Sequence, residues 1–228
     1  MNVKTLKSFT LFFIIKSFTL VMGDDMDQLN YRLPKRKDGL KTFNKIISTG
    51  KKLFSKQGYQ ATSINEIIEK SKIATGTFYI YFDDKLALYV YLLQHYRNKI
   101  REAINDSIKG AQTRREKERL GIRAFLKFAW QDPLSYRIIW ESMFVDESLF
   151  KEYYENFAKA YTVNLEDGIK SNEVDENIDT ETLSYILMGI SNFVGLQVLF
   201  RDTLTDMDLD KIVDQVMYVL DHGMFKNA

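Results

Sequence analysis

The stretch ATGTFYIYFDDK, residues 74–85, gathers the side chains of this sequence that are best suited to binding phosphate oxygens. It holds two threonines, two tyrosines and a lysine, whose hydroxyl and ammonium groups donate hydrogen bonds to phosphate. Phe78 and Phe82 lie one helical turn apart, which is the spacing of a buried pair. Tyr79 and Tyr81 are then expected to point away from the core with exposed hydroxyls. The stretch predicts a binding surface built on a packed helix.

Residues capable of catalysis or metal binding are sparse. The chain has no cysteine, and its two histidines, His95 and His222, are far apart. Neither an HExxH motif nor a phosphate-binding glycine loop is present. Glu141, Asp146 and Glu147 could pair for acid–base work, but carboxylates on helical surfaces are usually solvated or act as caps. We expect no enzyme activity, no cofactor and no metal site.

The helices around this stretch form a recognisable unit. A long helix comes first, because apolar residues from Leu40 onward recur at steps of three and four until Gly58 closes the pattern. Ser63 with Glu66 three residues later is the pattern of a capping box, in which both side chains bind amides at a helix start. A third helix, 75–82, follows a tight turn. The last two predict a helix-turn-helix, whose second helix enters the DNA major groove by its N-terminus.

The remainder of the chain is predicted to be helical throughout. Asp84 caps a long helix that runs to about Ser107, and five further apolar-periodic segments follow: 114–131, 133–145, 147–172, 180–200 and 206–225. The sequence therefore predicts an all-α fold of about nine helices. We divide it into an N-terminal tail (1–33), a three-helix DNA-binding domain (34–84) and a C-terminal helical domain (85–228).

The charge of the chain is unevenly distributed. Residues 31–101 hold 15 Lys and Arg against 5 Asp and Glu, whereas residues 102–228 hold 14 against 23, although the whole chain carries only +1. This asymmetry predicts a polyanionic partner for the N-terminal domain alone. Chance segregation of solvated charges is the alternative.

The N-terminal tail begins with 22 residues that repeat KSFTL at a nine-residue interval. Their apolar run is broken by Lys16, so it is a poor membrane span, and it lacks a signal-peptide cleavage site. We interpret it as a dispensable tail that arises when the start codon is assigned upstream of Met22 or Met26. Without cysteine or a secretion signal, the sequence favours a cytoplasmic protein with no membrane partner.

The segment TSINEIIEKSKIATGTFYIYFDDKLAL, residues 62–88, resembles the signature of the TetR family of bacterial transcriptional regulators. With KLFSKQGYQATSI before it, the resemblance extends over about 50 residues, and the lysine after GTFYIYF falls at the family's spacing. The resemblance implies a homodimer that binds a palindromic operator on double-stranded DNA. It also implies that the operator is released when a small molecule occupies the C-terminal domain.

The resemblance assigns DNA contacts by position to seven residues: Ser63, Thr75, Gly76, Thr77, Tyr79, Tyr81 and Lys85. Thr75, Gly76 and Tyr79 would face bases or sugars, Ser63 would cap its helix and contact phosphate, and the other three would hold the DNA backbone. Two residues depart from the family pattern. Lys72 stands in a turn where glycine is common and would need a positive φ, and Ala74 is a weaker helix cap than serine.

An effector cavity is predicted in the C-terminal domain. Eleven aromatic residues lie between Phe125 and Tyr161, which is typical of a large apolar cavity for a lipophilic or acyl-chain ligand. Aromatic residues at helical spacing that simply fill a core are the alternative. The candidate lining residues, with Asn192 as a polar contact or a satisfied buried amide, are Trp130, Tyr136, Trp140, Phe144, Phe157, Tyr161 and Asn192.

The segment 180–200 is apolar nearly all round its helix and needs neighbours on several sides. We expect the last two helices to pair with a second copy of the chain, and burial within one monomer is the alternative. The function predicted from these features is a homodimeric repressor released from its operator by a small lipophilic ligand. Sequence-tolerant DNA binding without ligand control is the competing function.

Overall fold

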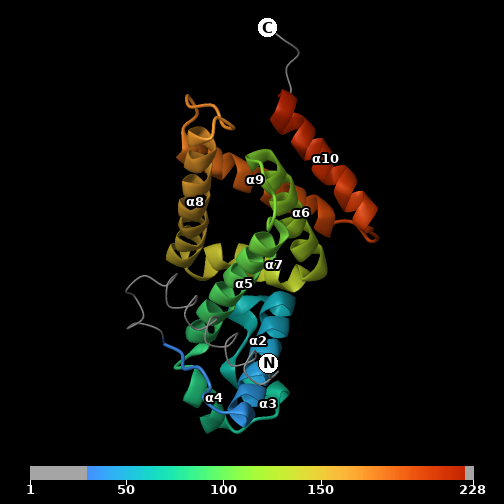
Figure 1. Cartoon of the computed structure of the whole chain (residues 1–228). Helices are drawn as coiled ribbons and strands as arrows, with labels where there is room; N and C mark the ends of the chain where they lie inside the picture. Colours follow the sequence, from blue (N-terminus) through green and yellow to red (C-terminus); the bar gives the residue numbers. More distant parts are fainter. Residues whose placement is uncertain (1–29, 224–228) are drawn as a thin grey trace, which may run out of the picture.

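The computed structural model describes residues 30–223 of the chain (Figure 1). Within that range the fold is all-α, as predicted, and consists of nine helices. Three helices come first, α2 (Lys37–Ala61), α3 (Ile64–Ser71) and α4 (Thr75–Tyr81). The others are α5 (Lys85–Ser107), α6 (Arg114–Gln131), α7 (Pro133–Val145), α8 (Glu147–Lys170), α9 (Thr180–Leu199) and α10 (Asp206–His222). The proposed N-terminal tail lies almost wholly outside the described residues.

Short polar side chains determine where most helices begin. In seven of the nine described helices a Ser, Thr or Asp side chain accepts a hydrogen bond from an amide in the first turn. The predicted caps at Ser63 and Asp84 are confirmed. The Glu66 half of the predicted capping box is absent, because that carboxylate instead accepts hydrogen bonds from Gln57 and Lys70.

The helices form two ends joined by α5, as Figure 1 shows, with α2–α4 at one end and α6, α8, α9 and α10 toward the other. One hydrophobic core extends from α2–α4 into α5, α7 and α8. Tyr31 extends this core from outside the helices, because it forms an isolated bridge with Phe82 and donates its hydroxyl to Gln94 at 2.7 Å. The proposed domain boundary at residue 84 therefore falls inside one continuous core.

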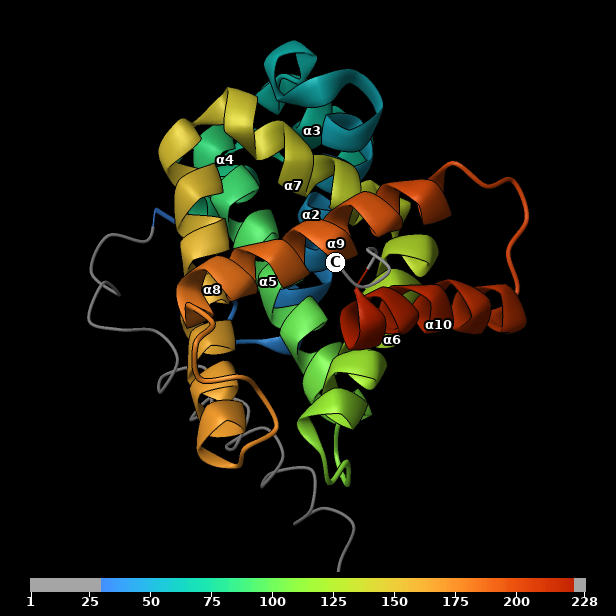
Figure 2. The ribbon, with the colours of Figure 1, turned by 90° about the horizontal axis from the view of Figure 1, so that it is seen from above.

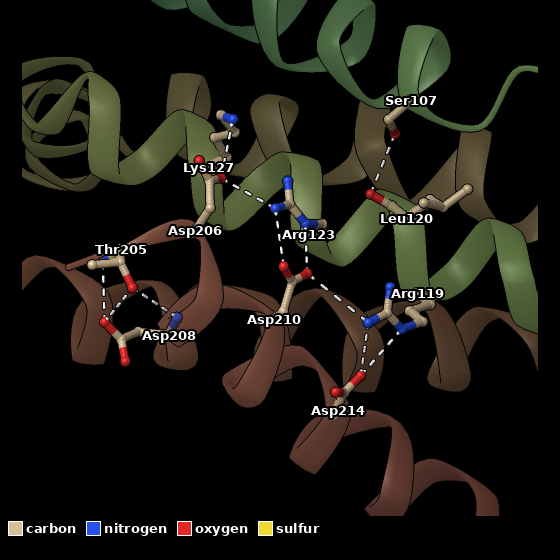
Figure 3. Close-up of polar contacts among 10 residues, drawn as sticks. All are labelled: Ser107, Arg119, Leu120, Arg123, Lys127, Thr205, Asp206, Asp208, Asp210 and Asp214. Carbon is tan, nitrogen blue, oxygen red and sulfur yellow. Dashed lines mark hydrogen bonds and ion pairs between the residues drawn. The ribbon is translucent and has the colours of Figure 1, made fainter.

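A ladder of ion pairs joins α6 to α10, part of which is drawn in Figure 3. Four cationic residues recur every fourth position of α6 and meet four aspartates of α10 in reverse order: Arg115 with Asp221, Arg119 with Asp214, Arg123 with Asp210 and Lys127 with Asp206. Each pair is partly exposed and contributes little alone, but the shared partners form a network. Beneath it, apolar residues of α6 and α10 form a second core.

The helix α9 leaves much of its apolar surface uncovered. It packs against α6 and α8, burying Leu187 and Val198, while Ile186 and Phe193 are 51% and 66% exposed. Figure 2 shows α9 and α10 from above, and the two helices line a groove of about 530 Å³. Among residues 30–223, α9 alone is long and apolar enough to cross a membrane, a test that helices of soluble proteins also pass.

Candidate nucleic-acid interface and effector cavity

The N-terminal edge of α4 is the exposed surface of the helix-turn-helix. Thr75 and Gly76 are exposed, and Tyr79 is 46% exposed. A Cβ added to Gly76 would meet no atom within 4 Å, so nothing inside the protein requires glycine there. Thr77 lies half-buried beside them, and Ser63 is exposed at the start of α3. Of the seven predicted contact residues, Thr75, Gly76, Thr77 and Tyr79 lie on this helix, whereas Ser63 lies at the start of α3.

The turn between α3 and α4 adopts the predicted left-handed conformation. Lys72 has a φ of 53° and a ψ of 52°, and its backbone N–H donates to Glu69 and Ile68 at the end of α3. Its side chain is exposed, so a lysine at this position adds a cation beside α4. Ala74 provides no side-chain cap, as predicted, so α4 depends on packing for its stability.

The two phenylalanines supply that packing. Phe78 and Phe82 are both 0% exposed, which confirms the predicted buried pair. Phe82 stacks on Phe43 of α2 with ring centroids 5.3 Å apart, and it also lies near Tyr91 of α5. The ring of Phe82 therefore packs the end of α4 against α2 and α5.

The prediction of an exposed Tyr81 is wrong. Its ring is 9% exposed and meets Phe43 edge-on, and its hydroxyl donates to the Gly39 carbonyl at 3.3 Å. The reason is that α4 ends at Tyr81 and Phe82 takes an extended conformation, so the two successive rings pack inward from different directions. Tyr81 therefore anchors the start of α2.

Lys85, predicted to contact phosphate, has its partners within the protein in the structure. Its Nζ donates to the carbonyls of Tyr59 and Thr62, both at 2.7 Å, and lies 4.2 Å from the centre of the Tyr59 ring. Burial lowers the pKa of Lys85, and the nearby Glu141 carboxylate raises it in part. Lys85 therefore closes the end of α2 from the first turn of α5.

Gly58 interrupts α2, and hydrogen bonds with α5 and α7 hold the residues that follow it. Gly58 has a φ of 84°, and the N–H of Tyr59 donates to Glu141 of α7 at 2.5 Å. A Cβ on Gly58 would lie 2.9 Å from the same carboxylate, so both the conformation and the space require glycine. We call the Tyr59 peptide with Lys85 and Glu141 the interdomain latch. Sequence analysis missed it, because its members lie up to 82 positions apart and share no motif.

A second polar link lies between α2 and the α6–α7 corner. Lys51 Nζ donates to Asp132 at 2.5 Å, and the side chains are 21% and 23% exposed. Asp132 also accepts a hydrogen bond from the Ser135 amide as the cap of α7. Burial raises the pKa of Asp132, but the hydrogen bonds and the charge of Lys51 outweigh it and hold that pKa below its ordinary value.

This link predicts a pH-dependent contribution to stability. Because the pKa of Asp132 is lower in the folded state, its contribution is complete above the unfolded pKa of roughly 4 and is lost as pH falls through the folded pKa. We expect Asp132→Asn, which can still cap α7, to lower the free energy of unfolding at pH 7 by about 1–2 kcal/mol. Urea unfolding between pH 7 and pH 3 should show this difference shrinking below about pH 4. A constant difference would contradict the assignment.

A cavity of about 370 Å³ lies between α5, α6, α8 and α9. Of the seven predicted lining residues, Phe157, Tyr161 and Asn192 border it. Asn192 also proves to be a satisfied amide, because it accepts a hydrogen bond from Tyr154 and donates one to the Met188 carbonyl. The cavity is partly aromatic, as expected, but α5 contributes more of it than the aromatic pattern indicated.

The other four predicted lining residues lie elsewhere. Phe144 is 81% exposed near the end of α7. Tyr136 is buried and donates its hydroxyl to the Asn192 carbonyl at 2.5 Å, while Trp140 packs against Phe193. Trp130 packs against the second core. Helical spacing is the same for aromatic residues that fill a core, lie on the surface or border a cavity. The positions at which the helices cross decide which rings border the cavity.

Three cationic residues that sequence analysis did not select also border the cavity: Arg101, Arg114 and Lys117. Arg114 forms an ion pair with Glu118, and Glu118 also accepts a hydrogen bond from the Tyr161 hydroxyl. Burial raises the pKa of Tyr161, and the charge of the Glu118 carboxylate raises that pKa further. Within residues 30–223, no group of three or more His, Cys, Asp or Glu side chains is placed to hold a metal ion.

Comparison with known proteins identifies this architecture. The family model described as bacterial regulatory proteins, tetR family, matches residues 46–92, which include α3, the turn, α4 and Lys85. The chain belongs to the TetR family. The resemblance inferred from residues 62–88 is thereby confirmed, and membership of this family agrees with the expectation that the chain is not an enzyme.

Relatives in the TetR family match different shares of this chain. The transcriptional regulator YuxN of Bacillus subtilis is 43% identical over 70 residues, covering 30% of this chain and 24% of YuxN. QacR of Staphylococcus aureus is 29% identical over 121 residues, covering 53% of this chain and 58% of QacR. The matches thus span between about a quarter and three fifths of these relatives' lengths.

The C-terminal domain resembles solved TetR-family structures in fold. FadR from Bacillus subtilis, solved in complex with stearoyl-CoA, superposes with a TM-score of 0.71 over 80% of this chain and 100% of that chain. At 20% identity, this likeness establishes the fold of the helices around the cavity and leaves the ligand open.

Proposed function

We propose that this TetR-family member is a homodimeric transcriptional repressor that binds a palindromic operator in the bacterial cytoplasm. The exposed N-terminal edge of α4, with an open glycine in its first turn, carries the proposal. No atom of residues 30–223 lies within 4 Å of a Cβ built on Gly76, so this edge is open to a partner. The excess of positive charge in residues 31–101 supports DNA as that partner.

In this proposal the residues of the edge have separate tasks. Thr75, Gly76 and Tyr79 face base edges or sugars, and Ser63 and Thr77 contact the DNA backbone. The exposed Lys72 contributes a further phosphate contact from the turn. Tyr81 and Lys85 support this surface indirectly, because they hold the two ends of α2 against α4 and α5.

Gly76→Ala should separate stability from DNA binding. Alanine favours a helix over glycine by about 0.5–1 kcal/mol and has open space here, so we expect a higher melting temperature. Operator affinity should fall by roughly 1–3 kcal/mol, because the added methyl group holds the backbone away from the groove. Circular dichroism and fluorescence anisotropy measure the two effects. Gly121→Ala in α6 is the matched control, since it should leave operator affinity unchanged; unchanged affinity in Gly76→Ala would remove α4 from the interface.

We further propose that α9 and α10 form the dimer interface. Their exposed apolar side chains include Phe193 at 66%, Tyr218 at 59% and Val219 at 49%, and Val219 also borders the groove between them. These side chains suit a second copy of the same face. The ion ladder holds α10 in place for this contact. Such a dimer would set the spacing of two α4 helices on successive major grooves.

Release of the operator by a ligand follows from the connections between the two ends. An effector in the cavity contacts α5 and α8, while α5 and α7 hold the latch at the base of the helix-turn-helix. The FadR structure supports an acyl-chain ligand as one candidate class. Binding of effector and operator must then weaken each other reciprocally.

Selection from a random duplex DNA library at near-physiological salt tests the proposed function. We expect enrichment of an inverted repeat, with two protomers bound to each site in analytical ultracentrifugation. A folded protein that binds DNA but enriches no sequence would favour the competing function, sequence-tolerant binding without ligand control. A protein that does not bind DNA would refute both functions.

A further inference from the structure

Arg101 of α5 carries a half-buried positive charge at the border of the cavity. One of its terminal nitrogens, Nη2, donates to the Asn156 carbonyl at 2.5 Å, and its guanidinium lies 4.9 Å from the centre of the Phe157 ring. Its Nε is buried and has no hydrogen-bond partner among residues 30–223. A carbonyl and an aromatic face therefore position this group without neutralising it.

A second arginine increases the uncompensated charge. Arg97 lies one helical turn earlier on α5, is 7% exposed, and also has a buried Nε without a partner. In the described part of the chain neither arginine forms an ion pair, in contrast to Arg114, which also borders the cavity and is paired with Glu118. Burial lowers the pKa of Arg101, and the charge of Arg97 lowers it further.

Like charges one turn apart on a helix destabilise each other, and a buried charge without a partner is costly. The residues that border the cavity include no aspartate or glutamate that could offset Arg101. The remaining wall is largely apolar, with Ile104, Ile108 and Phe125 among its members. The cavity thus combines cationic side chains, among them the unpaired Arg101, with a largely apolar wall.

We propose that the effector of this protein is an amphipathic anion whose acidic group binds Arg101 and whose apolar chain lies along α5 and α6. This inference rests on the proposed function of the cavity as an effector site, but it concerns the chemical class of the ligand. The acidic group accepts hydrogen bonds from the guanidinium, and Arg97 adds attraction from one turn away. A cavity of about 370 Å³ is near the lower end of the usual range of ligand sites, which suits a single short chain.

Calorimetry with sodium decanoate, its neutral counterpart 1-decanol, and decanoyl-CoA tests the proposal on the full-length protein. We expect decanoate to bind more tightly than decanol. Arg101→Met should weaken decanoate binding by roughly ten- to hundredfold, the loss expected for a charge-assisted hydrogen bond, and leave decanol binding unchanged. Arg101→Lys should retain most of the affinity. The same Arg101→Met change should raise the melting temperature of the ligand-free protein, because it removes one of two like charges that stand one helical turn apart.

Arg137→Met is the matched control, because Arg137 is exposed on α7 away from the cavity, and it should change neither measurement. If only decanoyl-CoA binds, and Arg101→Met weakens it, the anion is a phosphate rather than a carboxylate and the proposal stands. Equal binding of decanoate and decanol, full affinity in Arg101→Met, or no binding of either anion would overturn it. None of these results depends on DNA, so operator binding by the same preparations shows separately whether the proposed function fails.

Discussion

Replacing Phe82 with alanine is expected to lower the free energy of unfolding by about 3–5 kcal/mol and to abolish operator binding. Phe82 is 0% exposed, and its ring lies within 6.5 Å, centroid to centroid, of Tyr31, Phe43, Phe78 and Tyr91. Removing it leaves a cavity where α4, α2 and α5 meet. Since α4 has no side-chain cap, packing is the main support of the recognition helix, and the loss should disorder it. Urea unfolding and operator anisotropy measure the two effects.

Ile80→Ala is the control for Phe82→Ala. Ile80 stands on the same helix but is 59% exposed, so its truncation should change the free energy of unfolding by about 0.5 kcal/mol or less. A large loss from Ile80→Ala together with a small one from Phe82→Ala would mean that α4 is rotated relative to the structure described above.

Glu141→Ala should loosen the interdomain latch. The Tyr59 amide would lose its acceptor and Lys85 its nearby carboxylate, which we expect to reduce the local free energy of opening by about 1–3 kcal/mol. Hydrogen exchange of the Tyr59 amide should become roughly ten- to hundredfold faster. Operator affinity should also fall, because the turn before α3 is no longer held to α7. Amide exchange followed by NMR reports the first effect without any knowledge of the effector.

Two further variants make the Glu141 test specific. Glu141→Gln keeps an acceptor oxygen at the same position and should restore slow exchange of the Tyr59 amide. Glu166→Ala removes an exposed carboxylate of α8 and should have no effect on that amide. Unchanged exchange in Glu141→Ala would show that the latch does not hold the base of the helix-turn-helix in solution.

Local sequence patterns predicted the helices and the helix-turn-helix well. Apolar residues at steps of three and four determine which face of a helix is buried, so Phe78 and Phe82 could be assigned to the core. Caps such as Ser63 and Asp84 bind amides within three residues, so they too are visible in the sequence. The left-handed conformation of Lys72 was implied by the resemblance to the TetR family, in which glycine is common at this turn position.

The tertiary structure decided how these elements use their remaining groups. Tyr81 is buried because the chain leaves α4 at that residue, a change of direction that helical periodicity does not contain. Lys85 and Glu141 meet at Tyr59 only because α5 and α7 both pack beside the end of α2. The cavity belongs to helices far apart in sequence, so the predicted Phe144 proved exposed and the unpredicted Arg101 borders it. Interactions within a turn or two of helix are determined by the sequence itself, whereas contacts between distant segments depend on the angles and positions at which whole helices pack.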